Sequence, residues 1–174
     1  MHWLSLALVL TIPLTAAAPE PPDEYRVKAA FLFNFARFVE WPPEAFTGPY
    51  APLVLCVLGE DPFGRALDEA VADKKIDGRA IAVRRFSDAR QSKGCRMLFV
   101  APSERRRTLS VLEALDEPGL LTVGESDSPT AEGLVIIFTL EAGKVRFVIN
   151  VAVAEREKLH VSSRLLSLAA TLKR

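Results

Sequence analysis

The stretch from Tyr25 to Pro43, YRVKAAFLFNFARFVEWPP, constrains the fold of this chain more than any other part of the sequence. When it is drawn as a helix at about 100° per residue, four apolar side chains share one narrow stripe: Val27, Phe31, Phe35 and Phe38. The Pro42-Pro43 pair cannot continue a helix. The sequence therefore predicts a helix that buries this aromatic stripe in the core and ends at the two prolines.

One large side chain of this stretch lies off the stripe. Phe33 projects on the polar side of the predicted helix, where Arg37 follows it one turn later. A large ring among charged side chains is either covered by another segment or exposed for a partner. The loop from Glu44 to Pro52 is a candidate cover. In the alternative, Phe33 and Arg37 form a partner surface, because aromatic and arginine side chains are enriched at protein interfaces.

The amino-terminal residues have the pattern of a secretory signal. The uncharged run from Trp3 to Leu14 is too short to span a bilayer, and small residues follow it. We expect residues 1–17 to be a signal peptide and residues 18–174 to be a single exported domain. No other stretch is long and apolar enough to enter a membrane. The mature protein is therefore expected to be soluble in a compartment that permits disulfides.

Apolar runs alternate with helical patterns along the rest of the chain. The predicted strands are residues 53–58, 80–83, 95–101, 120–123, 134–140 and 144–150. Glu141-Ala142-Gly143 joins the last two as a hairpin, and helical patterns at 151–158 and 162–172 end the chain. This order predicts an α/β three-layer sandwich: a mostly parallel, doubly wound sheet with a C-terminal antiparallel hairpin and helices on both faces.

Cys56 and Cys95 are the two cysteines of the chain. Cys56 lies in the first predicted strand and Cys95 begins the third, and a doubly wound sheet of order 2-1-3 makes these strands neighbours. In an oxidising compartment this arrangement favours a disulfide, worth roughly 3–4 kcal/mol on the chain-entropy estimate. Two buried free thiols are the alternative.

The sequence predicts no catalytic, cofactor or metal site. The turn from Gly59 to Gly64 follows a strand, but it lacks the Lys-Ser/Thr of a Walker loop and the third glycine of a dinucleotide fingerprint. His160 has no second histidine or cysteine nearby for a metal site or a triad. The chain has 22 Lys and Arg residues and 22 Asp and Glu residues, so its net charge is 0. This balance argues against a nucleic-acid partner, which would require a basic surface. The run from Arg105 to Arg107 is either a solvated helix face or a patch for an acidic partner.

Four segments of the chain resemble the YfiR family of bacterial periplasmic proteins. They are FARFVEWP at 35–42, CVLGEDPFG at 56–64, CRMLFVAPSE at 95–104, and GKVRFVIN followed by LHVSSRLLSLA at 143–169. The resemblance implies a non-enzymatic regulator that binds the periplasmic domain of an inner-membrane diguanylate cyclase and represses it, which lowers cyclic-di-GMP signalling and biofilm formation. It also implies a homodimer and a core disulfide at Cys56 and Cys95. Some relatives carry a second cysteine pair, which this sequence lacks.

Two other functional classes remain open from the sequence. The domain could serve a different membrane receptor, such as a histidine kinase, by binding a small molecule or the receptor itself. An enzyme is disfavoured, because the sequence contains no catalytic constellation.

Overall fold

The computed structural model describes residues 22–115, 117–126 and 133–173, and the predicted signal peptide lies outside these ranges. The helices are α1 Asp23–Phe38, α2 Arg65–Val71, α3 Thr108–Glu113, α4 Val151–Arg156 and α5 Ser163–Leu168, with short 3₁₀ helices at Pro43–Ala45, Ala89–Ser92 and Pro102–Arg107. The strands are β1 Val39–Glu40, β2 Leu53–Leu58, β3 Lys75–Ile76, β4 Arg79–Phe86, β5 Met97–Val100, β6 Leu121–Glu125, β7 Ile136–Glu141, β8 Lys144–Asn150, β9 His160–Val161 and β10 Thr171–Lys173.

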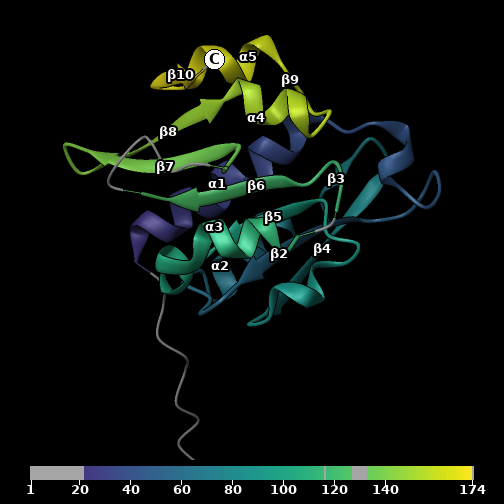
Figure 1. The fold of residues 1–174 in the computed structure, drawn as a ribbon, viewed down its shortest axis with the longest axis horizontal. Coiled ribbons are helices and arrows are strands. Elements are labelled where there is room, and N and C mark those ends of the chain that lie inside the picture. Colours follow the sequence, from purple (N-terminus) through teal and green to yellow (C-terminus); the bar gives the residue numbers. More distant parts are fainter. Residues whose placement is uncertain (1–21, 116, 127–132, 174) are drawn as a thin grey trace, which may run out of the picture.

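One sheet of eight strands crosses the molecule in the order β10-β8-β7-β6-β5-β2-β4-β3 (Figure 1). The strands from β4 through β2, β5 and β6 to β7 are parallel, because helical crossovers connect most of them. β8 returns antiparallel to β7 as the predicted hairpin. The structure confirms the predicted fold, including the neighbouring positions of β2 and β5 at the centre of the sheet.

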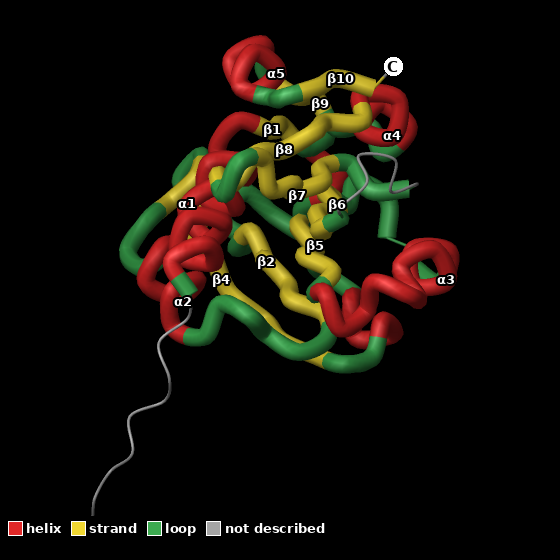
Figure 2. Tube along the Cα trace, turned by 90° about the vertical axis from the view of Figure 1, so that its left-hand side faces the viewer, coloured by secondary structure: helices red, strands yellow, loops and turns green. Residues whose placement is uncertain are grey.

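The helices cover both faces of the sheet, so that the molecule has three layers. Figure 2 shows α1 and α2 on one side of the strands and α3 on the other. The larger apolar core lies between the sheet and the α1 side, and a second core lies beneath α3. α4 and α5 follow the hairpin near the β10 edge of the sheet.

The sequence did not predict the two strands at the edges of the sheet, β3 and β10. β3 pairs antiparallel with β4 across the Asp77-Gly78 turn. The prediction of a helix over residues 162–172 was wrong at its carboxyl end. α5 ends at Leu168, and the residues after it form β10, which pairs in parallel with β8. The Ala170 backbone N–H donates to the Phe147 carbonyl at 2.9 Å, which begins this pairing. The strand satisfies the backbone groups along the edge of β8, and this outweighs the helical spacing of the leucines.

The aromatic helix forms, but it presents a different face to the core. Its buried side chains are Lys28, Ala29, Leu32, Phe35 and Ala36. Val27 is 46% exposed, contrary to the prediction, and Phe31 and Phe38 are only half-buried. Two alanines on the buried face let the helix lie close to the sheet, while the large rings at its border reach in from the side. The helix also ends before the two prolines, at Phe38, because β1 begins there and pairs with β9.

Candidate functional site

The topological switch point of the sheet lies between β2 and β5. From β2 the chain passes through α2 to β4 on one side, whereas β5 continues to β6 on the other. In doubly wound proteins this reversal opens a crevice at the carboxyl ends of the strands, and ligands bind there. The loops at 59–64 and 101–104 follow these two strands, and therefore they flank the expected crevice.

These two loops touch each other. The Glu60 backbone N–H donates a hydrogen bond to the Ser103 hydroxyl at 3.0 Å. Gly59 has a φ of +97°, and a Cβ at this position would lie 2.5 Å from Ser103 Oγ and 2.8 Å from Glu104 Cγ. Only glycine permits both this backbone conformation and this approach. The crevice is thus closed by direct contact at the point where a phosphate loop would approach its ligand.

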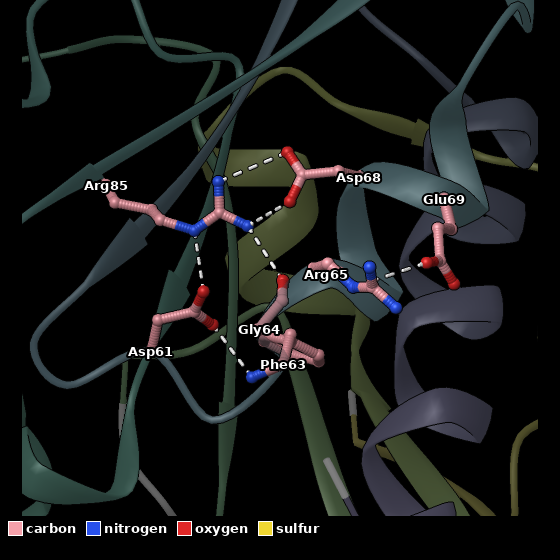
Figure 3. Close-up of polar contacts among 7 residues, drawn as sticks. All are labelled: Asp61, Phe63, Gly64, Arg65, Asp68, Glu69 and Arg85. Carbon is pink, nitrogen blue, oxygen red and sulfur yellow. Dashed lines mark hydrogen bonds and ion pairs between the residues drawn. The ribbon is translucent and has the colours of Figure 1, made fainter. Parts of the chain in front are cut away.

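Arg85 on β4 holds the first loop against α2 (Figure 3). Its Nε donates to Asp61 at 2.6 Å, and its two terminal nitrogens donate to the Asp68 carboxylate at 2.6 and 3.2 Å. The Gly64 carbonyl accepts a further bond at 3.1 Å, and the other oxygen of Asp61 accepts the Phe63 backbone N–H at 2.8 Å. Hydrogen bonds to Asp68 and then Asp61 raise the pKa of Arg85 above its ordinary value. One guanidinium therefore fixes both the loop and the start of α2.

Aromatic rings fill the space beneath this loop on the α1 side. Phe63 is fully buried and packs edge-to-face against Phe99 with ring centroids 4.7 Å apart. Tyr25, in the first turn of α1, meets the other side of Phe63 at 5.5 Å. The amino-terminal end of α1 thus packs against the loop that follows β2, on one side of the switch point.

A buried charged cluster lies next to these rings. Lys28 is 2% exposed, and its Nζ lies 2.7 Å from Oε2 of Glu125, the last residue of β6. The same ammonium pairs with Glu24 one helical turn before it and lies 4.5 Å from the centroid of the Tyr25 ring. The Tyr25 hydroxyl donates to Glu125 at 3.4 Å. Burial and then the Glu125 carboxylate raise the pKa of Tyr25 above its usual range.

Sequence reasoning missed this cluster. The Glu24–Lys28 spacing was the one local signal of an ion pair in the sequence. Glu125 comes from a distant strand, and no periodicity links it to α1. Its Oε1 is buried and has no hydrogen-bond partner among the residues that the structure describes. The cluster joins α1 to β6 through four side chains that contact one another.

Within residues 22–115, 117–126 and 133–173, no group of three His, Cys, Asp or Glu side chains could hold a metal ion. His160 is exposed and lies opposite Glu40 in the short β1–β9 pair.

The predicted disulfide is present. Cys56 and Cys95 are bonded, with their Cα atoms 6.0 Å apart, and both side chains are fully buried in the core beneath α3. The bond joins β2 to the segment that enters β5, so it crosslinks the two strands at the switch point. No free cysteine remains in the described chain.

A comparison with known protein families gives one match. The sequence profile of one protein family matches residues 25–170, which is most of the chain. The chain belongs to the YfiR/HmsC-like family. No curated protein matches the chain. The resemblance seen in the sequence motifs is thereby confirmed.

Two of the segments that indicated the YfiR/HmsC-like family build the closed switch point. CVLGEDPFG is the end of β2 with the first loop, and CRMLFVAPSE contains Cys95, β5 and the second loop. FARFVEWP holds the end of α1 and Trp41, whose indole N–H donates to the Arg96 carbonyl at 3.1 Å. These segments thus form the disulfide, the central strands and the loop contact, which are parts of the scaffold.

Phe33 and Arg37, the two residues of the predicted partner surface, differ in burial. Phe33 is half-buried and packs against the main core, and Lys74 Nζ lies 4.3 Å from its ring centroid. The loop 44–52, the candidate cover, is held to β4 by Arg79, which donates to two carbonyls of that loop. Arg37 is exposed, and its guanidinium lies 5.5 Å from the ring of Phe38.

Proposed function

We propose that this protein is an exported regulator that binds the periplasmic sensor domain of an inner-membrane diguanylate cyclase and represses it. Repression lowers cyclic-di-GMP inside the cell and disfavours biofilm formation. The match of the YfiR/HmsC-like family to residues 25–170 carries this proposal, because the family resemblance implies this activity. Self-association as a homodimer belongs to the same proposal.

The structure supports a role in protein binding rather than in small-molecule chemistry. The crevice in which this architecture binds nucleotides is closed by Gly59 and Ser103 and is filled on one side by Tyr25 and Phe63. The disulfide and the Arg85 network hold this region in one conformation. A rigid scaffold of this kind presents its outer surfaces to a partner with little loss of conformational entropy on binding. We infer that the protein acts by contact and not by catalysis.

The proposed location is the periplasm. A stable disulfide between buried cysteines fits an oxidising compartment, and the signal pattern at residues 1–17 gives the route of export. Cleavage there leaves residues 18–174 as one domain. In the described part of the chain, no helix has both the length and the apolar character needed to cross a bilayer.

Affinity capture from the native bacterium tests the function. The exported protein, tagged at its carboxyl end, is crosslinked in intact cells, and the membrane proteins captured with it are identified by mass spectrometry. A diguanylate cyclase with a periplasmic domain should be enriched over a strain that carries the tag on an unrelated periplasmic protein. A variant that lacks residues 2–17 is the matched control, since it stays in the cytoplasm and should capture no cyclase. Enrichment of a receptor of another class, such as a histidine kinase, would contradict the proposal and favour the alternative.

A further inference from the structure

An arginine–phenylalanine arrangement lies on the α1 side of the molecule, at the end of α1. Phe38 is the last residue of this helix, and its ring is half-buried. The Arg37 guanidinium lies 5.5 Å from the ring centroid, and the Arg164 guanidinium, from α5, lies 5.4 Å from it. Two cations from different helices therefore share one aromatic ring.

The backbone around this ring holds both helices in place. The Ser162 backbone N–H donates to the Phe38 carbonyl at 3.0 Å, and the Ser162 hydroxyl caps α5 by accepting from the Leu165 N–H at 3.3 Å. Val39 pairs with Val161 in the antiparallel β1–β9 pair. Arg37 and Arg164 thus project from the ends of two helices whose backbones are joined by hydrogen bonds near the Phe38 ring.

Neither arginine forms an ion pair with a residue that the structure describes, and both side chains are exposed. Other arginines of the chain are engaged: Arg85 binds Asp61 and Asp68, and Arg107 binds Glu104. Glu40 follows two residues after Phe38 and is also exposed, but it pairs with neither guanidinium. The two cations therefore remain available for an external anion.

An exposed apolar side chain lies near one of the two cations. Leu168 lies one helical turn after Arg164 on the same side of α5 and is 60% exposed. An exposed leucine, one turn from an arginine that contacts an aromatic ring, fits the composition of a protein interface, where aromatic and arginine side chains act as anchors. We call Arg37, Phe38, Arg164 and Leu168 the clamp surface.

We propose that the clamp surface docks an acidic segment of a protein partner. A carboxylate of the segment binds between the Arg37 and Arg164 guanidiniums, and a neighbouring aliphatic side chain packs on Leu168. Charge complementarity favours a protein over a nucleic acid or an anionic membrane, because two arginines beside a leucine suit one or two carboxylates, and the chain has a net charge of 0. The inference rests on the proposed function, since it names the surface that would meet the sensor domain.

Charge reversal on the clamp surface tests the proposal. The captured sensor domain is titrated with the wild-type protein and with Arg37→Glu, Arg164→Glu and the double variant in isothermal calorimetry. Each single reversal should weaken binding by about tenfold or more, and the wild-type affinity should fall as salt is raised. Arg65→Glu, at an exposed arginine of α2, is the matched control and should bind like the wild type. A folded double variant that binds within twofold of the wild type would overturn the proposal.

A peptide titration tests the surface without the cyclase. A capped Leu-Glu-Leu-Glu peptide, titrated into isotopically labelled protein, should shift the NMR signals of the Phe38 ring and of the Arg37 and Arg164 Nε–H groups. The shifts should vanish in the double variant and with a Leu-Gln-Leu-Gln peptide. Equal shifts from both peptides, or none from the acidic one, would contradict the clamp surface. Capture of no cyclase by the wild type, together with the expected peptide shifts, would contradict only the proposed function.

Discussion

Lys28 Nζ lies 2.7 Å from Glu125 Oε2, although the lysine is 2% exposed and its helix is otherwise anchored by apolar packing. The pair links the first turns of α1 to the carboxyl end of β6, beside the closed switch point. Two buried charges of opposite sign compensate each other, but the loss of one partner leaves the other charge unpaired in an apolar setting. The stability of the α1 layer should therefore depend on both members together.

Lys28→Met should lower the free energy of unfolding by about 3 kcal/mol, because it leaves the Glu125 carboxylate buried without its cation. The double variant Lys28→Met/Glu125→Met should recover most of this loss, since it replaces the pair with apolar side chains. Urea denaturation followed by circular dichroism measures both. An unchanged free energy of unfolding in Lys28→Met would show that the Lys28–Glu125 pair does not contribute to stability.

Removal of the disulfide should destabilise the protein without changing its fold. Cys56→Ala/Cys95→Ala frees a loop closed by residues 39 positions apart, and the chain-entropy estimate gives a loss of roughly 3–4 kcal/mol. Urea denaturation of the variant and the wild type measures the difference. Mass spectrometry after alkylation should find no free thiol in the exported wild type. Two alkylated cysteines in freshly prepared protein would contradict the structure.

The Asp88 carboxylate should titrate well below its ordinary range. Hydrogen bonds from the Arg90 side chain, and then from its backbone N–H, lower the pKa of Asp88 from 3.8 to about 2. Because the folded-state pKa is depressed, the contribution of this carboxylate to stability is present above pH 4 and is lost as the pH falls toward 2. Carboxyl-carbon NMR should give a midpoint near 2 in the wild type and a clearly higher one in Arg90→Gln. A wild-type midpoint at 3.8 would refute this expectation.

Phe33 should behave as a packing residue. It is half-buried against the core and lies beneath Lys74, so Phe33→Ala should cost about 2 kcal/mol of unfolding free energy. Val27→Ala on the same helix is the control and should cost under about 0.5 kcal/mol, since Val27 is 46% exposed. Affinity of the folded variant for the captured partner should be unchanged. If Phe33→Ala leaves the stability unchanged but weakens partner binding, Phe33 belongs to the partner surface and the packing role is contradicted.

The central strands and the disulfide were predictable from the sequence because their signals are local. Continuous apolar runs identify buried parallel strands, and the order of strands and helices places β2 beside β5. The cysteine pairing then follows from this neighbour relation. The family motifs were recognisable for the same reason, since they are short continuous runs of the sequence.

The buried face of α1 and the charged cluster were not predictable in the same way. Hydrophobicity ranks Val27 above Ala29, yet the alanine faces the sheet because its small side chain allows close packing. Lys28 is buried by a carboxylate that only the tertiary fold supplies. The clamp surface likewise combines Phe38 with Arg164 from the far end of the chain, and no spacing in the sequence connects them.

The central claim is repression of a diguanylate cyclase, and cellular cyclic-di-GMP tests it most directly. The nucleotide is quantified by mass spectrometry in the wild-type bacterium, in a strain that lacks this protein, and in a strain that lacks both the protein and the captured cyclase. Loss of the protein alone should raise cyclic-di-GMP several-fold, and loss of the cyclase as well should return it to the wild-type level or below. Cyclic-di-GMP that stays unchanged without the protein, or that rises equally without the cyclase, would contradict the account.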